Sequence, residues 1–304
     1  MRILKALLFL CSGLLLLACG VHVAQSGRPP DPLPEKSEGA LRIATHNVHY
    51  IVLGQSEGRW SVADWEARKT ALGAAFKAID ADIVAFQEME SFSRGSDGSV
   101  NLTLDYLLAE TPGHGAAAVG DWREFPSTQP ILYRRDRVEV LDQGWFFFSE
   151  TPDVIYSRTF NGSWPAFASW ARFRDRTTGA AFRVVNVHFE YRSRSNRRLS
   201  AALVAERTGP WIAAGETVIL AGDLNAMHGA RTLELLEDAG FAFLPVDGAT
   251  YHFDRGINLF GAIDHLAVSG GAAAAGPPVV LRERFAGDWP SDHYPVFADL
   301  LIGP

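Results

Sequence analysis

The chain has 304 residues, of which 47% are hydrophobic and 21% are charged, and this composition excludes a disordered or fibrous protein. Its formal net charge is −7, so it lacks the broad basic surface that drives tight non-specific binding of nucleic acid. We therefore expect a globular protein with no tight non-specific affinity for nucleic acid, although a local basic groove is compatible with this charge.

The amino terminus has the pattern of a bacterial export signal. Arg2 and Lys5 precede an apolar run that is too short to be a good membrane-spanning helix. The run ends in LLACG at residues 16–20, which resembles the bacterial lipoprotein signal, in which the cysteine becomes the first mature residue and carries lipid. The resemblance implies a signal peptide over residues 1–18 and lipidation at Cys19. The protein would then be an exported lipoprotein anchored to the outer membrane or to a periplasmic or extracytoplasmic membrane face. The alternative is a cleaved signal peptide whose cysteine is incidental.

A segment rich in proline, glycine, serine and charged residues follows the apolar run. It cannot bury enough apolar area to order itself, so we expect a semi-extended tether over residues 19–39. The folded domain is expected to occupy residues 40–304 as a single unit. Cys11 would be removed with the signal and Cys19 would carry lipid, which excludes disulfides and cysteine catalysis in the mature chain.

The first part of this domain predicts two buried strands and two helices. Residues 41–45 alternate like a strand that ends in polar residues, and residues 82–86 form a second strand of the same kind. Between them, Ser61 and Asp64 make a capping-box pattern at the start of a helix. A short helix is expected over residues 102–110.

Several strands are expected next. Residues 130–133, 137–141 and 145–148 predict three successive strands, and the aromatic third one is better interpreted as a core strand than as a membrane-insertion finger. Residues 168–173 and 181–189 look like the two strands of a hairpin.

The remaining elements bring polar side chains to strand ends. Because side chains in an extended segment alternate faces, Asp223 and Asn225 point the same way, and so do Asn186 and His188. Helices are expected over residues 200–214 and 232–239, and strands over residues 218–221, 262–268 and 294–300.

Acid, amide and histidine side chains recur wherever these strands begin or end. Buried strands do not need such residues for folding, and an unpaired buried charge is costly. Strand ends that converge on one rim of a sheet would offset that cost, so the pattern predicts an active site. The ordered set is THN at 45–47, QE at 87–88, NVH at 186–188, GDLN at 222–225, IDH at 263–265 and SDH at 291–293.

The ordered set resembles the motifs of the endonuclease/exonuclease/phosphatase superfamily, which has the DNase I-like fold, and the resemblance covers residues 41–302. It implies an α/β (α+β) fold, a four-layer sandwich in which two packed mixed β-sheets are flanked by helices, with the site at one edge. The implied chemistry is metal-assisted hydrolysis of a phosphate ester.

The residues themselves support the same chemistry. A phosphate ester resists attack because it is negatively charged, so a catalyst needs a divalent cation, a base for water and donors around the phosphoryl oxygens. Glu88 is the expected Mg²⁺ ligand, since Mg²⁺ takes few carboxylates and keeps several waters. Asn47 would assist at the metal or hold Glu88, and the resemblance implies that Asp292 lies at or near the metal. Mn²⁺ is an alternative ion, and the choice between one and two ions stays open.

The resemblance also implies roles for five further residues. Asp223 would orient or deprotonate the attacking water, and Asn225 would contact the phosphate. Asp264 would accept the ring proton of His293, which would touch the scissile phosphate. His188 would also contact the phosphate and would act on the leaving-group side as a donor or general acid. Whether Asp223 or His293 is the formal base stays open, because a coupled carboxylate and imidazole titrate as a pair.

Two features leave the substrate open. Many secreted relatives carry an arginine where this chain has Ala166 and Phe167, so either Arg158 substitutes for it or that substrate contact is missing. Four clustered arginines could bind a polyanion, or they could form a solvated face at the entry to a helix. They are Arg192, Arg194, Arg197 and Arg198.

The sequence therefore leads to the hypothesis of a membrane-anchored, monomeric, Mg²⁺-dependent phosphoesterase that binds a phosphate-ester substrate. A nuclease, a phospholipid or sphingolipid diesterase and a small phosphatase are all compatible with it. The alternative from another class is a non-catalytic surface lipoprotein that keeps the fold as a binding module. The intact set of acids, amides and histidines argues against that alternative.

Overall fold

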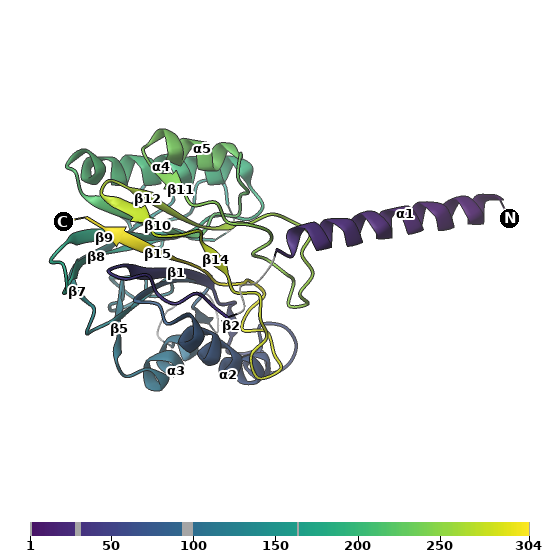
Figure 1. Cartoon of the computed structure of the whole chain (residues 1–304), viewed down its shortest axis with the longest axis horizontal. Coiled ribbons are helices and arrows are strands. Elements are labelled where there is room, and N and C mark those ends of the chain that lie inside the picture. Colours follow the sequence, from purple (N-terminus) through teal and green to yellow (C-terminus); the bar gives the residue numbers. More distant parts are fainter. Residues whose placement is uncertain (1, 28–31, 93–99, 163, 304) are drawn as a thin grey trace.

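Two β-sheets packed face to face form the centre of the molecule in this computed structural model, which describes residues 2–27, 32–92, 100–162 and 164–303 (Figure 1). The first sheet contains β1 (Leu41–Asn47), β3 (Ile83–Gln87), β5 (His114–Ala117), β6 (Ile131–Arg134), β13 (Ala272–Ala274), β14 (Val279–Val280) and β15 (Val296–Ile302). Its strand order is β13-β15-β1-β3-β6-β5, and β14 also pairs with β15. A separate parallel pair is formed by β2 (Ile51–Val52) and β4 (Ser91–Phe92).

The second sheet has the strand order β11-β12-β10-β9-β8-β7. Its strands are β7 (Val138–Phe147), β8 (Phe167–Asp175), β9 (Ala181–His188), β10 (Thr217–Asp223), β11 (Ala242–Phe243) and β12 (Asp264–Ser269). The helices are α1 (Arg2–Gln25), α2 (Val62–Ile79), α3 (Leu102–Glu110), α4 (Arg194–Ala213) and α5 (Arg231–Asp238).

Three apolar layers hold the sheets and helices together. One lies between the two sheets, a second lies between the second sheet and α4 and α5, and a third lies between the first sheet and α2 and α3. Figure 1 shows α4 and α5 on one outer face of the sandwich and α2 and α3 on the other. Strands buried on both faces are nearly continuously apolar, as β10 is. The predicted four-layer sandwich of two mixed sheets flanked by helices is confirmed.

The pairing of the strands brings the polar motifs to one edge. β1 pairs in parallel with β3, and β9 pairs in parallel with β10, so the carboxyl ends of these four strands lie at the same edge. β12 runs antiparallel to β10 and places Asp264 opposite Asp223, while His188 lies opposite Asp223 from the other side. β15 runs antiparallel to β1, so the residues just before it also reach this edge.

Gly222 is required where β10 approaches β9. Its φ is +156°, and a Cβ atom placed there would lie 2.0 Å from the carbonyl oxygen of Val187. That distance is far inside van der Waals contact, so any side chain would push the two strands apart. The glycine therefore lets Asp223 follow at a fixed distance from His188 on the neighbouring strand.

Most expected elements are confirmed, and two differ. The strands expected over residues 137–141 and 145–148 are a single strand, β7, because a bulge between Val140 and Asp142 absorbs the break in the alternation. Phe146, Phe147 and Phe148 are buried, which confirms a core position for this aromatic segment. The helix expected over residues 200–214 begins six residues earlier, at Arg194, because the Ser193 hydroxyl caps it by accepting from the backbone N–H of Asn196.

The amino-terminal segment is a helix, α1, whose carboxyl end contacts the domain, so residues 19–25 of the expected semi-extended tether are helical instead. The backbone N–H of Ala249 donates to the Gln25 carbonyl, and the Asn258 side chain donates to Ser26. Among the helices that the structure describes, none has the length and apolar character needed to cross a membrane. Residues 28–31 of the predicted tether lie outside the described residues. Nearer the domain, Lys36 pairs with Asp82, so this end of the segment lies against the sheet.

Candidate active site

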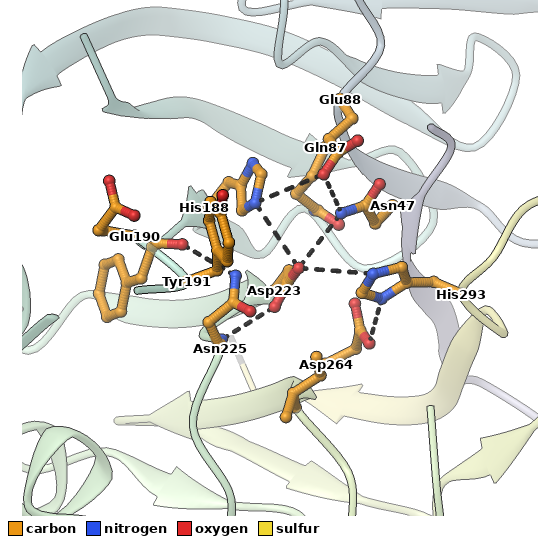
Figure 2. Close-up of polar contacts among 12 residues, drawn as sticks. Asn47, Gln87, Glu88, His188, Glu190, Tyr191, Asp223, Asn225, Asp264 and His293 are labelled. Carbon is orange, nitrogen blue, oxygen red and sulfur yellow. Dashed lines mark hydrogen bonds and ion pairs between the residues drawn. The ribbon is translucent and has the colours of Figure 1, made fainter. Parts of the chain in front are cut away.

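Asp223 lies at the centre of the converging strand ends. Figure 2 shows its carboxylate with His188, Asn47 and His293 arranged around it. Its Oδ2 lies 3.6 Å from Nε2 of His188, 3.8 Å from Nε2 of His293 and 3.2 Å from Nδ2 of Asn47. Only about 1% of Asp223 is exposed. The predicted grouping of residues from both sheets around this carboxylate is therefore present.

Glu88 and Asn47 form the side of the site that belongs to the first sheet. Nδ2 of Asn47 donates to Oε1 of Glu88 at 3.0 Å, and His188 lies 3.7 Å from the same oxygen. Glu88 follows β3 with a φ of +54°, a left-handed conformation that few residues other than glycine adopt. This turn directs its carboxylate toward the neighbouring sheet, as strained backbone often does at functional sites.

Asn225 is held beside Asp223 in a similar way. Its φ is +47°, its backbone N–H donates to Oδ1 of Asp223 at 2.9 Å, and its Nδ2 donates to the Phe189 carbonyl at 2.9 Å. An amide nitrogen carries two N–H bonds, so the second can donate to a phosphate oxygen. The position is compatible with the phosphate contact expected from the sequence.

Asp264 and His293 form a buried pair on the opposite side of Asp223. Nδ1 of His293 lies 2.9 Å from Oδ2 of Asp264, and neither residue is more than 6% exposed. Burial by itself would lower the pKa of His293, but the charge and hydrogen bond of Asp264 outweigh it and hold that pKa well above its ordinary value. His293 is therefore a cation at neutral pH.

Burial raises the pKa of the two carboxylates, Glu88 and Asp223, and lowers the pKa of the second imidazole, His188. Burial, together with the charge of Asp292, raises the pKa of Glu88 to about 7. Burial, together with the charge of Asp264, raises the pKa of Asp223 to about 6. Burial also lowers the pKa of His188, against the attraction of Asp223. Perturbed groups of both kinds clustered at one sheet edge are typical of catalytic sites.

Asp292 lies beside this cluster with partners of its own. Its Oδ2 accepts a hydrogen bond from Nη2 of Arg59, and its Oδ1 lies 3.3 Å from the Ser291 hydroxyl. Burial would raise the pKa of Asp292, but His293, His49 and Arg59 hold it below its ordinary value. The structure therefore brings Asn47 and Glu88 together as expected and pairs the third predicted metal ligand with an arginine.

The donor set suits a divalent cation with oxygen ligands. Carboxylate oxygens of Asp223 and Asp264 lie within 4.8 Å of each other, and Glu88 lies on the other side of Asp223, whereas the protonated imidazole of His293 has no lone pair for a metal ion. Among the described residues, Oδ1 of Asp264 is buried and has no hydrogen-bond partner. The carboxylates of Glu88, Asp223 and Asp264 outnumber the one protonated imidazole beside them, so the site can hold a further positive charge. These residues fit Mg²⁺ or Mn²⁺, although the identity of an ion does not follow from them.

A buried amide pair links the two sheets beneath the site, and no role was expected for it from the sequence. Nε2 of Gln87 donates to Oδ1 of Asn186 at 2.7 Å, and Nδ2 of Asn186 donates to the Phe86 carbonyl at 2.7 Å. Both side chains are fully buried. Gln87 directly precedes Glu88, and Asn186 lies two positions before His188 on β9, and this proximity is the only sign of the pair in the sequence. The pair fixes the spacing between β3 and β9.

A cavity of about 100 Å³ opens beside His188 and Glu88. Glu90 and Glu190 line it, together with the aromatic side chains of Tyr50, Trp164 and Tyr191. Trp164 and Tyr191 are 75% and 60% exposed. Figure 2 places Glu190 and Tyr191 on the His188 side of the cluster. Of the described residues that line the cavity, none is lysine or arginine, so the wall is acidic and aromatic.

The four clustered arginines differ in burial, since Arg197 is buried and the other three are exposed. Arg197 is largely buried, and its guanidinium donates to the backbone carbonyls of Glu190 and Tyr191. The guanidinium of Arg192 lies 5.0 Å from the centre of the Tyr191 ring. These two arginines therefore contact the cavity wall, while Arg194 and Arg198 are exposed in the first turns of α4.

The comparisons with known proteins agree with this geometry. A family model described as the Endonuclease/Exonuclease/phosphatase family matches residues 44–293. No curated protein matches the chain. Among solved structures, an endonuclease/exonuclease/phosphatase from Bacteroides vulgatus is 26% identical, with a TM-score of 0.71, and the match covers 87% of this chain and 99% of that one.

Two further structures widen the comparison. A mannosyl-6-phosphatase from Bacteroides thetaiotaomicron is 25% identical, with a TM-score of 0.71, and the match covers 86% of this chain and 99% of that one. The catalytic domain of human nocturnin is 14% identical, with a TM-score of 0.63, over 91% of this chain and 99% of that domain. The second likeness concerns the fold alone.

Proposed function

Because the chain belongs to the endonuclease/exonuclease/phosphatase family, we propose that it is a phosphoesterase that depends on a divalent metal ion. The observation that carries this proposal is the position of Asp223, which lies within 4 Å of two imidazoles and of the amide that also holds Glu88. This is an arrangement in which water, a phosphate and a cation can be held together. A bound Mg²⁺ or Mn²⁺ would supply Lewis-acid stabilisation of the phosphoryl charge.

The side chains divide the chemistry between them. Asp223 orients the attacking water and accepts its proton when its carboxylate is ionised. His293, which Asp264 keeps protonated, donates to a phosphoryl oxygen and offsets the charge that develops there. His188 has a lowered pKa and lies on the side of the cavity, where it contacts the leaving group. Glu88 and Asn47 would hold the metal ion.

The cavity favours a small ester over a nucleic acid. Its glutamates repel a second phosphate group, whereas their oxygens accept hydrogen bonds from hydroxyl groups. The exposed rings of Trp164 and Tyr191 provide flat apolar surface for a sugar-like ring. We therefore favour a phosphomonoester of an uncharged, hydroxyl-bearing group. The likeness to a phosphatase whose name specifies a sugar phosphate supports this choice.

A substrate panel tests the proposal. Sugar phosphates, an activated monoester, an activated diester, phospholipids, DNA and RNA are each incubated with the protein in Mg²⁺, Mn²⁺ or EDTA. We expect metal-dependent release of phosphate, fastest from a sugar phosphate. Fastest cleavage of DNA or a phospholipid would retain the phosphoesterase and reject the small monoester. No metal-dependent turnover of any substrate would favour the non-catalytic binding module.

We also propose that the protein is an exported lipoprotein that acts as a monomer. The proposal is supported by the lipoprotein-like signal around Cys19. In cells supplied with labelled palmitate, the wild-type protein should become labelled and the Cys19→Ser variant should not. Labelling of the Cys19→Ser variant would contradict lipidation at this residue. Sedimentation of the solubilised protein measures its oligomeric state.

A further inference from the structure

A second cluster of metal-ligand types lies next to the catalytic centre. Ligand atoms of His49, Asp254 and Asp292 all lie within 4.8 Å of one another. The cluster is coupled to the catalytic centre through Asn47, whose Oδ1 accepts from the backbone N–H of His49 while its Nδ2 donates to Asp223 and Glu88. The three residues come from loops and a strand entry, which the sequence pattern did not group.

A guanidinium occupies the middle of this cluster. Nε of Arg59 donates to Nε2 of His49 at 3.2 Å and lies 3.3 Å from Oδ2 of Asp254. Nη2 of the same side chain donates to Oδ2 of Asp292. The Arg59 guanidinium therefore contacts all three members of the cluster. In each case it contacts an acceptor atom whose lone pair could otherwise bind a metal ion.

The surrounding charges make a cation necessary at this point. The Asp292 side chain is only 8% exposed, and the second nearby arginine, Arg68, is engaged elsewhere. Arg68 pairs with Asp64 at 3.1 Å and donates to the backbone carbonyls of Val48 and His49. It therefore fixes the backbone beneath the cluster, and Arg59 provides the direct charge compensation above it. The Arg59 side chain is 41% exposed, so solvent and ions can reach the cluster from its side.

We propose that Arg59 is a built-in cation that takes the place of a second divalent metal ion, so that this chain uses a single ion in its catalytic centre. A guanidinium is planar and carries one positive charge. Because it is covalently part of the chain, it cannot exchange with ions in solution as a bound metal ion can. The positive charge beside Asp292 is then present whatever the metal concentration. Removing the guanidinium leaves one imidazole and two carboxylates that can bind a divalent ion.

The test counts bound Mn²⁺ ions by equilibrium titration with EPR detection of the free ion, on the full-length protein. Mn²⁺ suits the test because it binds carboxylates and its free form is counted directly. We expect Arg59→Ala and Arg59→Gln to bind one more Mn²⁺ equivalent than the wild type. Arg59→Lys, which keeps a positive charge, should bind the wild-type number. Adding Asp292→Asn to Arg59→Ala should remove the gained site.

The control is Arg123→Ala, which removes an exposed arginine paired with Asp121 and should leave the Mn²⁺ count unchanged. Equal counts for wild type, Arg59→Ala and Arg59→Gln would overturn the proposal, and so would two Mn²⁺ ions on the wild type with one lost in Asp292→Asn. Should the neutral variants be unfolded by circular dichroism, Mn²⁺ should restore their folding, and failure to do so would also overturn it. If the wild type binds no Mn²⁺, the proposed metal-dependent function is contradicted. The proposal for Arg59 is judged independently, because it depends on the difference in Mn²⁺ count between the Arg59 variants and the wild type.

Discussion

Nδ1 of His293 lies 2.9 Å from Oδ2 of Asp264, and the other nitrogen of the same ring lies 3.8 Å from Asp223. The imidazole therefore stands between two carboxylates, one that fixes its charge and one that faces the reaction. Asp264 is fully buried, so its charge acts on His293 with little screening by solvent. This pair connects the start of β12 to the residues just before β15.

Replacing Asp264 should change the pH dependence of the reaction as well as its rate. The charge of Asp264 holds the pKa of His293 above its ordinary value, so His293 stays protonated in the wild type at neutral pH. In Asp264→Asn that pKa should fall, and the loss of activity at high pH should begin at lower pH. We expect kcat to drop on the order of a hundredfold. The measurement is the pH profile of kcat/KM, and an unshifted high-pH limb would contradict the role given to this pair.

Removing the Glu88 charge should stabilise the metal-free protein at high pH. The pKa of Glu88 is about 7 in the folded chain against an ordinary 4.5, so the folded state binds the extra proton between these values. The contribution of Glu88 to the free energy of unfolding is thus fully present at low pH and is lost as pH rises through 7. In EDTA at pH 8, Glu88→Gln should be more stable than wild type by on the order of 1–3 kcal/mol, and the two should converge at about pH 4, below the ordinary pKa of the group. Urea unfolding at both pH values measures this, and a difference independent of pH would refute the expectation.

Gly222→Ala should disrupt the site through the backbone. The added methyl group would meet the Val187 carbonyl at 2.0 Å, so β9 and β10 must separate. We expect a loss of more than about 2 kcal/mol in the free energy of unfolding, together with loss of activity. The matched control is Gly209→Ala in α4, where a Cβ meets nothing within 4 Å and the helix should gain about 0.5–1 kcal/mol. Similar melting temperatures for the two variants would contradict the close approach.

The acidic cavity wall should determine which esters are accepted. In the double variant Glu90→Gln/Glu190→Gln the repulsion of a second anionic group is reduced, while the shape of the cavity is kept. We expect kcat/KM for a substrate with an additional phosphate to rise relative to that for a neutral sugar phosphate. Glu139→Gln, an exposed glutamate on β7, serves as the control. An unchanged ratio of the two kcat/KM values would show that this wall does not select the substrate.

The site residues at the strand ends were predictable because they are polar or charged, whereas a buried strand needs only apolar residues to fold. Asn47, Glu88, His188, Asp223 and Asp264 each lie at or next to a strand end, and their order along the chain matches a known arrangement. Parallel pairing of β1 with β3 and of β9 with β10 then brings these ends to one edge, and the sequence indicated only that the polar strand ends should converge, not which strands pair.

Other parts of the site left no such signal. Arg59 and Asp254 lie in irregular connections, and Asp254 adopts a positive φ of 57° that no periodic pattern reveals. Their meeting with Asp292 depends on how loops far apart in sequence fold over the sheet edge. Glu90 and Glu190 follow strand ends as closely as the predicted residues do, but the sequence does not show that they face a cavity. The bulge in β7 was likewise hidden, because one extra residue resembles a break between two strands.

Asp223 is assigned a role in metal-dependent hydrolysis of a phosphate ester, and the initial rate with an activated phosphomonoester in Mg²⁺ and in EDTA tests this claim. Wild type and Asp136→Ala, which removes an exposed aspartate next to β6, should hydrolyse the ester in Mg²⁺ at equal rates and stop in EDTA. Asp223→Ala, folded by circular dichroism, should be slower by at least about a hundredfold. Equal rates for Asp223→Ala and wild type, or a rate that EDTA leaves unchanged, would contradict the claim.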